Sequence, residues 1–519
     1  MKKAIYLIIA LIGLSAPSCS DSMLYFSPTD SGSGKELLKS ASTAITSVNG
    51  VYRSMWTAGW STTANTHQCF GIAAYNLALD CMADDLIMQS QGNGWFWGDH
   101  CYNVKSNYTS SAFRSYDVWY ANYKWIANVN YIIDAEPEMA GTEADVAYVA
   151  GQAYAIRALC YLNLATWFSR APYNSLTGAS RWNEPCVPVY TTGTSIDTGG
   201  QPRESLRTVY GRIDQDIDHA IELLEKARET TLAENNKSHI NLYVALGIKS
   251  RACLAEGDWD GAFKAAKRVI DEGGYAVGTK SDLTGGMNSL DKQNVMWGAG
   301  IQVADQAGGY AGFFTHMDNK EGAYAKSAPK LISKQLYNRI SATDIRRDWW
   351  DPSDKESPYV SKKFSFANVA SFLGDYIYMR VEEMYFTAAE AALRLDDLKS
   401  ARELMNTVMA ERDPGYSANN RSGTLLGATT TTWTGSFLEN ILTHRRIELW
   451  GEYGRLFDVR RLGQGIDRRT DDGFSEECIS MMNRRNVNIT KADTYDWVLT
   501  IPKAELDANP NINEEDQNP

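Results

Sequence analysis

The segment Ala255-Glu-Gly-Asp-Trp-Asp-Gly-Ala262 joins two stretches of helical periodicity, at residues 240–255 and 259–270. A second segment, Arg394-Leu-Asp-Asp-Leu-Lys-Ser-Ala401, joins another two such stretches and aligns with the first around its acidic turn. Small residues before the turn, Gly or Asp within it and an Ala after it allow two antiparallel helices to pack closely. Each segment therefore predicts a helical hairpin.

Helical periodicity extends over much of the rest of the chain. It predicts further helices at residues 37–55, 116–135, 144–168, 209–227, 381–395, 398–409 and 437–461. We expect 144–168 and 209–227 to form a third pair, separated by a long insert. Such pairs resemble divergent tetratricopeptide repeats, which stack into a right-handed scaffold. The sequence therefore predicts a mostly α, tetratricopeptide-like helical-pair scaffold with long irregular inserts, in a single domain over residues 35–519.

Long inserts interrupt the predicted helices. They are rich in Gly, Ser, Thr, Asn and aromatic residues, and they span residues 60–112, 169–203, 273–325, 340–377 and 413–435. Loops of this length inside a compact domain usually carry function or small irregular elements. The tryptophans within predicted helices need no function, and we expect them to be buried in the frame; these are Trp119, Trp125, Trp167 and Trp450.

The chain is acidic, with a formal net charge of −12 and a pI of about 5.2. Because nucleic acid demands a basic surface, we expect no nucleic-acid partner. The six His residues are scattered singly, which disfavours a His-based metal centre. The sequence contains no nucleophile elbow, Walker loop, HExxH or GxGxxG motif. The adjacent carboxylates Asp84-Asp85 and Glu382-Glu383 project in different directions on a helix, so they make a poor hydrolase dyad.

The N-terminus has the features of an exported lipoprotein. Two lysines precede an apolar run at residues 4–14, which is too short to span a bilayer and is typical of a signal peptide. Small residues lead from this run to Cys19, an arrangement that resembles the lipobox of bacterial lipoproteins. We predict a signal peptide at residues 1–18, lipidation of Cys19 and a flexible tether at residues 19–34.

The segment Arg445-Arg-Ile-Glu-Leu-Trp-Gly-Glu-Tyr-Gly-Arg-Leu-Phe-Asp-Val-Arg-Arg461 is dense in charge. Arg445 and Glu448 are three residues apart, as are Glu452 and Arg455, so both pairs are expected to meet on a helix surface. Arg445 shares a stripe with apolar residues, which indicates a paired charge held close to the core. We predict a structural ion-pair network rather than a ligand contact.

Four segments together resemble the SusD/RagB-like family of Bacteroidetes outer-membrane nutrient-binding lipoproteins. The first three are Arg157-Ala-Leu-Cys-Tyr-Leu-Asn-Leu-Ala-Thr-Trp-Phe-Ser-Arg-Ala-Pro172, Arg380-Val-Glu-Glu-Met-Tyr-Phe-Thr-Ala-Ala-Glu-Ala391 and the charged segment 445–461. The fourth is the C-terminal Trp497-Val-Leu-Thr-Ile-Pro-Lys-Ala-Glu-Leu-Asp-Ala-Asn-Pro510 with Gln517-Asn-Pro519. The resemblance implies a protein that captures nutrient, most often an oligosaccharide, for a partner SusC-like TonB-dependent transporter on the cell exterior. It implies binding without catalysis and without a cofactor.

An oligosaccharide site needs flat aromatic faces flanked by amides and carboxylates, because sugar rings have apolar C–H faces and hydroxyl-rich edges. The polar, Gly-rich segment Asp84-Asp-Leu-Ile-Met-Gln-Ser-Gln-Gly-Asn-Gly-Trp-Phe-Trp-Gly98 offers these groups together. We predict that its ligand contacts are Asp84, Asp85, Gln91, Asn93, Trp95 and Trp97. The alternative is that its tryptophans fill a gap between loop and frame. A second predicted set lies in other inserts, with core packing as its alternative: Trp297, Tyr310 and Trp349.

Three other functions stay open at this point. Some members of the family take peptides, and aromatic loops suit peptides as well as glycans. Many glycosidases have no short motif, so a surface glycoside hydrolase on a helical frame is the second. A purely structural surface lipoprotein is the third.

The cysteines after Cys19 are seven in number, which leaves at least one unpaired within the chain. Cys160 and Cys253 lie in apolar helical patterns and are predicted to be buried thiols. One disulfide among Cys69, Cys81 and Cys101 stays open, since they share a loop-rich region.

Overall fold

The computed structural model describes residues 34–57, 65–102, 113–195, 197–233, 237–303, 311–492 and 494–519. The predicted signal peptide, Cys19 and almost all of the tether lie outside the described residues, as does Tyr310. Helices occupy about 52% of the chain and the strands are short. The prediction of a mostly α fold is confirmed.

The helices differ widely in length. The longer ones are α3 (Ala41–Ser54), α4 (Ile72–Met82), α7 (Phe113–Ala135), α8 (Glu143–Phe168), α9 (Leu206–Lys226), α10 (Leu242–Glu256), α11 (Trp259–Glu272), α17 (Val381–Arg394), α18 (Leu398–Ala410), α19 (Phe437–Glu448), α20 (Arg455–Leu462) and α21 (Glu476–Arg484). The short ones are α2 (Gly34–Leu37), α5 (Trp97–His100), α12 (Lys280–Thr284), α14 (Phe313–Met317), α15 (Ala323–Ser327), α16 (Lys334–Tyr337) and α22 (Lys503–Ala508). The strands are β1 (Leu86–Met88), β2 (Val295–Ala299), β3 (Lys330–Ile332), β4 (Trp350–Asp351), β5 (Val360–Ser361) and β6 (Tyr376–Arg380).

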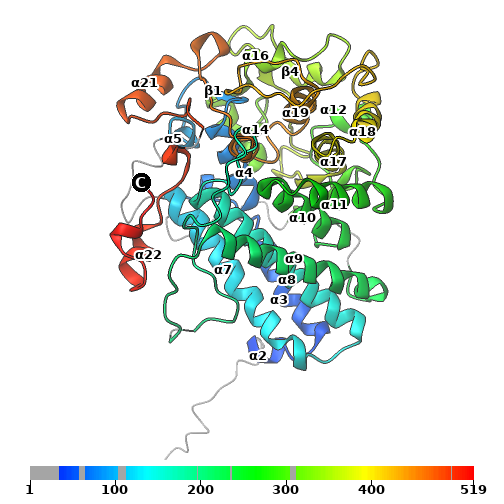
Figure 1. The fold of residues 1–519 in the computed structure, drawn as a ribbon, viewed down its shortest axis with the longest axis vertical. Coiled ribbons are helices and arrows are strands. Elements are labelled where there is room, and N and C mark those ends of the chain that lie inside the picture. The colour runs from blue at the N-terminus through cyan, green and yellow to red at the C-terminus, as the bar shows by residue number, and fades with distance from the viewer. Residues whose placement is uncertain are drawn as a thin grey trace, which may run out of the picture.

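The pairs α8–α9, α10–α11 and α17–α18 follow one another through the molecule, from the lower to the upper part of Figure 1. The two short joints use the same chemistry. Each contains a residue with positive φ, Gly257 at 77° and Asp396 at 62°. Each is followed by an Asp, Asp258 or Asp397, whose side chain caps the next helix by accepting a backbone N–H bond. All three predicted pairs are confirmed.

The single helix predicted over residues 437–461 is wrong, because the structure has two helices there, α19 and α20. Gly451 and Gly454 lie between them with φ of 76° and 93°. A Cβ atom on Gly454 would lie 2.9 Å from the Cβ of Leu79 in α4. The chain therefore passes too close to α4 for a side chain and turns through a conformation that favours glycine. The apolar periodicity on either side hid this break.

Helix α4 lies inside the insert that the sequence predicts to be irregular. All of its residues except Asn76 are buried, and it contacts α20, β1 and β6. A helix that is apolar all round has no hydrophobic face to mark it, so its periodicity is weak. For that reason the pattern does not reveal this helix.

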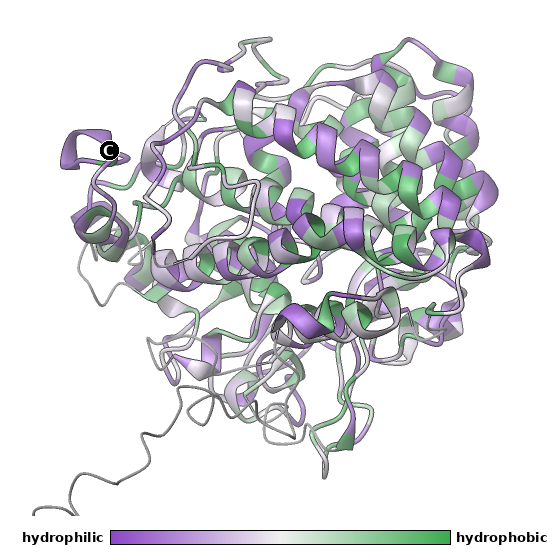
Figure 2. Cartoon of the chain, turned by 90° about the horizontal axis from the view of Figure 1, so that it is seen from below, coloured by the Kyte–Doolittle hydropathy of each residue, from purple (hydrophilic) through white to green (hydrophobic). Residues whose placement is uncertain are grey.

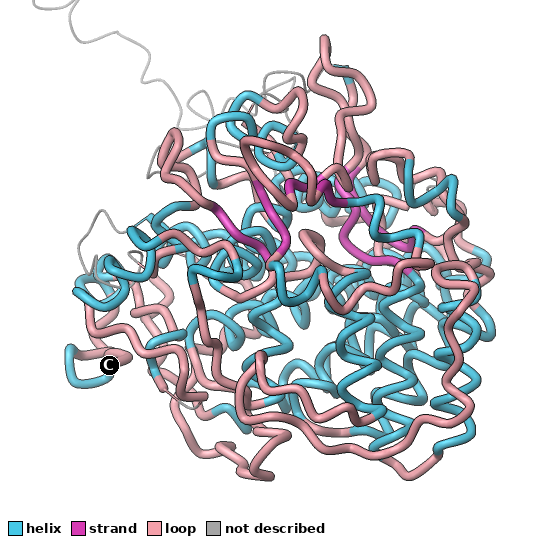
Figure 3. Tube along the Cα trace, turned by 90° about the horizontal axis from the view of Figure 1, so that it is seen from above, coloured by secondary structure: helices cyan, strands magenta, loops and turns pink. Residues whose placement is uncertain are grey.

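Two small antiparallel sheets lie together on one side of the helical pairs (Figure 3). The larger has the strand order β1-β3-β5-β4, and the smaller pairs β2 with β6. In the larger sheet Leu86 lies opposite Ile332. This pairing brings the loop after β1 beside the segment that leads into β3, although the two are far apart in sequence.

One large hydrophobic cluster contains residues from Ala41 to Ile512. The helices carry alternating hydrophobic and hydrophilic stripes, as expected when one face of each is buried (Figure 2). The four tryptophans of the predicted helices are at most 6% exposed, which confirms their burial, although Trp450 lies in the turn after α19. No helix in the described ranges is both long and apolar enough to cross a bilayer.

The seven cysteines from Cys69 onward are all buried, free thiols. Cys160 and Cys253 are thus buried as predicted, with exposures of 0% and 2%. Among the cysteines that the structure describes there is no disulfide, which answers the question left open for Cys69, Cys81 and Cys101.

Candidate ligand-binding site

Asp84 and Asp85 are buried members of an ion-pair cluster and do not face solvent. Arg446 Nη2 lies 3.0 Å from Asp84 Oδ2 and 2.5 Å from Asp85 Oδ1, and Arg455 Nε lies 3.0 Å from Asp85 Oδ2. Burial alone would raise the pKa of Asp84, but the two guanidinium groups outweigh burial and hold that pKa below its usual value. The prediction that these carboxylates contact ligand is corrected. Both form ion pairs with arginines of α19 and α20, and these pairs link the two helices to the chain before β1.

The predicted ion-pair network around residues 445–461 is present, but its partners differ from those predicted. Glu448 pairs with Arg346, Arg380 and Arg412 at 3.0, 3.0 and 2.9 Å. Arg445 Nε instead lies 2.8 Å from Asp458 Oδ2. Tertiary packing buries these side chains facing other elements, so the three-residue spacing does not select their partners.

Glu452 and Arg455 also pair with residues far away in the sequence. Glu452 pairs with Lys363 at 2.5 Å and with Arg380 at 2.7 Å. Arg455, which the spacing predicts to meet Glu452, lies beyond the break at Gly454 and pairs with the Asp84–Asp85 carboxylates. Because the helix ends after Glu448, a spacing rule for continuous helices fails for this second predicted pair.

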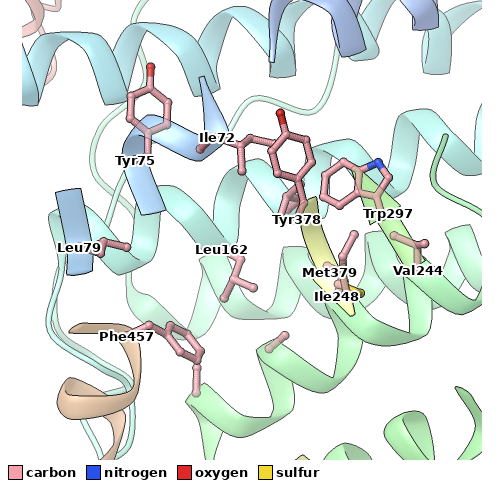
Figure 4. Packing of buried hydrophobic residues seen from close by; sticks show 14 of the residues in the cluster. Ile72, Tyr75, Leu79, Leu162, Val244, Ile248, Trp297, Tyr378, Met379 and Phe457 are labelled. Carbon is pink, nitrogen blue, oxygen red and sulfur yellow. The ribbon is translucent and has the colours of Figure 1, made fainter. Parts of the chain in front are cut away.

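Three of the predicted aromatic contacts lie in the core. Trp97 is 4% exposed and begins the short helix α5. Trp297 is 1% exposed, donates from its indole N–H to the carbonyl of Ser238 at 3.1 Å, and packs against Tyr378 with ring centroids 5.0 Å apart (Figure 4). Trp349 is 2% exposed and donates to the carbonyl of Leu283 at 2.9 Å. Their predicted ligand contacts are corrected, because a buried ring has no free face for a sugar.

Trp95 differs from these residues, since its side chain is only partly buried. Its ring stacks on His67, with centroids 4.7 Å apart and an interplanar angle of 19°. Tyr324 lies edge-on to Trp95 at 6.0 Å, and its hydroxyl shares a hydrogen bond of 2.6 Å with His67 Nδ1. We name His67, Trp95 and Tyr324 the aromatic cluster.

A buried residue supports the cluster from behind. His316 Nε2 donates to the carbonyl oxygen of His67 at 2.6 Å, and its ring lies 4.9 Å from that of Tyr324. Burial, aided by the charge of Lys330, lowers the pKa of His316 well below its ordinary value, so this imidazole is neutral at pH 7. A fixed, uncharged imidazole therefore supports the cluster from behind.

The turn between β1 and α5 decides which side chains face out. Gly92 and Gly94 have φ of 51° and 88°, and Gly94 N–H donates to the carbonyl of Gln91 at 2.8 Å. Phe96 has φ of 61°, and its N–H donates to Gln68 Oε1 at 2.8 Å. This geometry buries Phe96 while Gln91, exposed like Asn93, lies beside the partly buried Trp95.

The loop also fits closely against α15. A Cβ atom on Gly92 would lie 2.6 Å from the carbonyl oxygen of Ser327. This approach keeps the two exposed amides, Gln91 and Asn93, next to the helix that carries Tyr324. Of the predicted contacts, the structure therefore brings Gln91, Asn93 and Trp95 together at the surface.

His67 and Tyr324 were missed by the sequence analysis. A single His in an irregular segment carries no motif, and Tyr324 lies far along the chain from Trp95. The pairing of β1 with β3 brings Tyr324 to the loop that carries Trp95, and His67 contacts both residues. In the described ranges no group of three or more His, Cys, Asp or Glu side chains could hold a metal ion.

Two family models match the chain. Residues 326–519 match the model described as the SusD family, and residues 44–254 match one described as starch-binding, associating with outer membrane. The chain belongs to the SusD/RagB-like family. Its fold, with tetratricopeptide-like pairs and long inserts, is that of a SusD-like protein.

Solved structures agree with this assignment. A SusD-like carbohydrate binding protein from Bacteroides vulgatus is 25% identical with a TM-score of 0.72, covering 92% of this chain and 98% of its own. A SusD superfamily protein from Bacteroides thetaiotaomicron is 22% identical with a TM-score of 0.72, covering 92% and 100%. Surface glycan-binding protein A from Bacteroides thetaiotaomicron, in complex with laminarihexaose, shares the fold at 16% identity and a TM-score of 0.62, covering 92% and 99%. No curated protein sequence matches the chain.

Proposed function

We propose that this SusD-like protein binds nutrient oligosaccharides through the aromatic cluster and its flanking amides. The observation that carries the proposal is the partly exposed Trp95, stacked on His67 and braced by Tyr324. A rigid aromatic face loses little conformational entropy on binding and covers the C–H face of a sugar ring. The exposed side chains of Gln91 and Asn93 offer hydrogen-bond donors and acceptors for sugar hydroxyls. The structural relative that carries laminarihexaose supports a glycan as the ligand class.

The test is binding to a glycan panel, measured by gel retardation and calorimetry. We expect Trp95→Ala to weaken binding roughly tenfold or more, the equivalent of about 1.4 kcal/mol. Trp182→Ala is the matched control, because Trp182 is also half-buried but packs on Tyr210 with centroids 5.8 Å apart. Equal losses in both variants, or binding to a peptide pool alone, would overturn the proposal.

We propose binding without catalysis. The family supports this, because its matching model is named for starch binding and the similar Bacteroides vulgatus protein for carbohydrate binding. Purified protein incubated with a bound glycan is expected to release no reducing sugar. Release that survives further purification would instead establish a surface glycoside hydrolase.

We propose further that acylated Cys19 anchors the protein in outer-membrane lipid, facing outward, and that it delivers its ligand to a SusC-like TonB-dependent transporter. The family model that names the outer membrane supports this location. Cys19→Ala is expected to release the protein from membranes when the transporter is absent. Pull-down with the cognate barrel tests the partnership.

Tyr310, in the insert that precedes Tyr324, stays a predicted ligand contact.

A further inference from the structure

A pocket with aromatic walls lies between α7, α22 and a segment that contributes Tyr190, Thr194, Ser195 and Thr198. Its volume is about 450 Å³, within the range of small-molecule sites. Tyr120, Tyr123 and Tyr190 are partly exposed and provide aromatic walls, the buried Trp119 packs behind Tyr123, and Glu505 provides a carboxylate. None of these residues belongs to the aromatic cluster. In Figure 1 the pocket's elements α7 and α22 lie below α5, on the left of the molecule.

The aromatic walls form a rigid corner. Trp119 and Tyr123 are four residues apart on α7, so they share one helix face, with ring centroids 4.8 Å apart. Tyr190 meets Tyr123 at 5.9 Å and an angle of 89°. The Tyr123 hydroxyl donates to the carbonyl of Pro188 at 2.8 Å, and the Tyr190 hydroxyl accepts from the N–H of Gln201 at 3.0 Å. The hydroxyls are therefore tied to backbone, and the rings are preorganised.

Polar groups line the rest of the pocket. Glu505 accepts hydrogen bonds from Trp119 Nε1 at 3.2 Å and Asn509 Nδ2 at 2.8 Å, one on each oxygen. Each carboxylate oxygen can accept a further bond. Thr194, Ser195 and Thr198 line the loop side of the same cavity, and the Thr198 hydroxyl accepts from the Ser195 N–H at 2.8 Å. Aromatic faces beside a carboxylate and hydroxyls match a sugar ring, with its apolar face and its donating hydroxyls.

We propose that this pocket is a second saccharide subsite, which binds a short, neutral part of the oligosaccharide. A neutral ligand is favoured because the carboxylate of Glu505 and the ammonium group of Lys124 both line the cavity, so their charges balance. The subsite rests on the proposed function, since it assumes that the protein binds oligosaccharides. Two separate subsites would give a long glycan two points of attachment and raise its avidity.

The test uses the full chain and a probe of laminarihexaose, maltohexaose and xylohexaose, each followed by calorimetry and saturation-transfer NMR. Ala127 lines the pocket on α7, so Ala127→Trp fills the cavity without removing its walls. The adjacent Asn128 is exposed, and Asn128→Trp is the matched control. Unchanged melting temperatures of both variants verify folding. If Ala127→Trp does not fold, Glu505→Gln replaces it, because it keeps the volume and removes the charge.

We expect Trp95→Ala to retain weak binding of at least one probe, and Ala127→Trp added to it to weaken that binding roughly tenfold more. Asn128→Trp should have no effect. If Trp95→Ala alone abolishes all binding, the second subsite is overturned while the proposed function stands. If Trp95→Ala leaves the affinity unchanged but Ala127→Trp abolishes binding, the subsite stands and the proposed primary site fails. Absence of binding in the wild type, or pocket binding of peptides only, overturns the subsite.

Discussion

Arg380 Nη1 lies 3.0 Å from Glu448 Oε1, and both side chains are fully buried. Arg380 is the last residue of β6 and precedes α17, whereas Glu448 ends α19. Glu448 also accepts from Arg346 and Arg412. Although burial opposes ionisation, these three arginines hold the pKa of Glu448 well below its ordinary value. The carboxylate of Glu448 thus links the α17–α18 pair and the β2–β6 sheet to α19.

Glu448→Gln should therefore destabilise the fold strongly. Loss of the carboxylate leaves buried guanidinium groups without their countercharge, which typically costs about 3–5 kcal/mol. Urea denaturation followed by circular dichroism measures the free energy of unfolding. Glu403→Gln is the control, because Glu403 is 65% exposed and pairs with Lys399 at 3.8 Å, so its loss should cost about 0–1 kcal/mol. Similar losses in both variants would contradict the role assigned to Glu448.

Trp97→Ala should lower stability, and Trp95→Ala should lower binding. Trp97 is 4% exposed, so its truncation leaves a cavity and should cost about 3–5 kcal/mol. Trp95 is partly buried over His67, and the loss of its ring should cost much less. Thermal melts of both variants, run beside the glycan titration, separate the two effects. A Trp97→Ala variant with wild-type melting and lost binding would restore Trp97 as a ligand contact.

Gly454→Ala should destabilise the junction between α19 and α20. A side chain there needs φ of 93° and would push its Cβ to 2.9 Å from Leu79 Cβ, at a cost of at least about 1 kcal/mol. Gly211→Ala in α9 is the matched control, because nothing lies within 4 Å of its added Cβ. In a helix interior that change should stabilise by about 0.5–1 kcal/mol. Denaturant midpoints that shift in the same direction for both variants would refute the argument.

The ionisation of Glu256 should lower stability as the pH rises from about 5 to 9. Burial, with the nearby carboxylates of Asp214 and Asp258, raises the pKa of Glu256 from 4.5 to about 9. In this range the folded state keeps a proton that the unfolded state has released, so unfolding is favoured as the pH increases. Below the unfolded pKa, both states hold the proton and the penalty disappears.

Glu256→Gln removes this proton linkage. Its free energy of unfolding should match that of the wild type near pH 5 and exceed it near pH 9, because the amide does not ionise. Urea titrations across this pH range measure the difference, with Glu403→Gln as an exposed control. A difference between Glu256→Gln and wild type that does not grow with pH would contradict the shifted pKa of Glu256.

The helical pairs were predictable because their signals are local. The Asp of each joint caps the following helix with its own side chain, and the apolar stripes repeat along single helices. Helix α4 was not predictable, since it is buried on nearly every side and has no polar face. The break at Gly454 depends on the approach of α4, which is a tertiary contact.

The candidate site likewise has a part that could be predicted from the sequence and a part that could not. The Gly-rich loop with Trp95, Gln91 and Asn93 was visible in the sequence, because large aromatics between glycines in a polar stretch are unusual. The ion pairing of Asp84 and the burial of Trp97 could not be predicted, because an Asp serves an ion-pair network and a Trp serves a core as well as either serves a ligand site. Tyr324 joins the site through strand pairing across the chain, and His67 joins it through its contacts with Tyr324 and Trp95.

By itself, then, the sequence determined the helical-pair scaffold, the acidic charge and the loop in which the proposed binding tryptophan lies. These depend on side-chain periodicity, turn chemistry and composition, which act over a few residues. The tertiary structure alone decided which carboxylates are neutralised by arginine and which aromatic rings keep a free face. Burial and ion pairing are properties of segments brought together from opposite ends of the chain, so no local pattern encodes them.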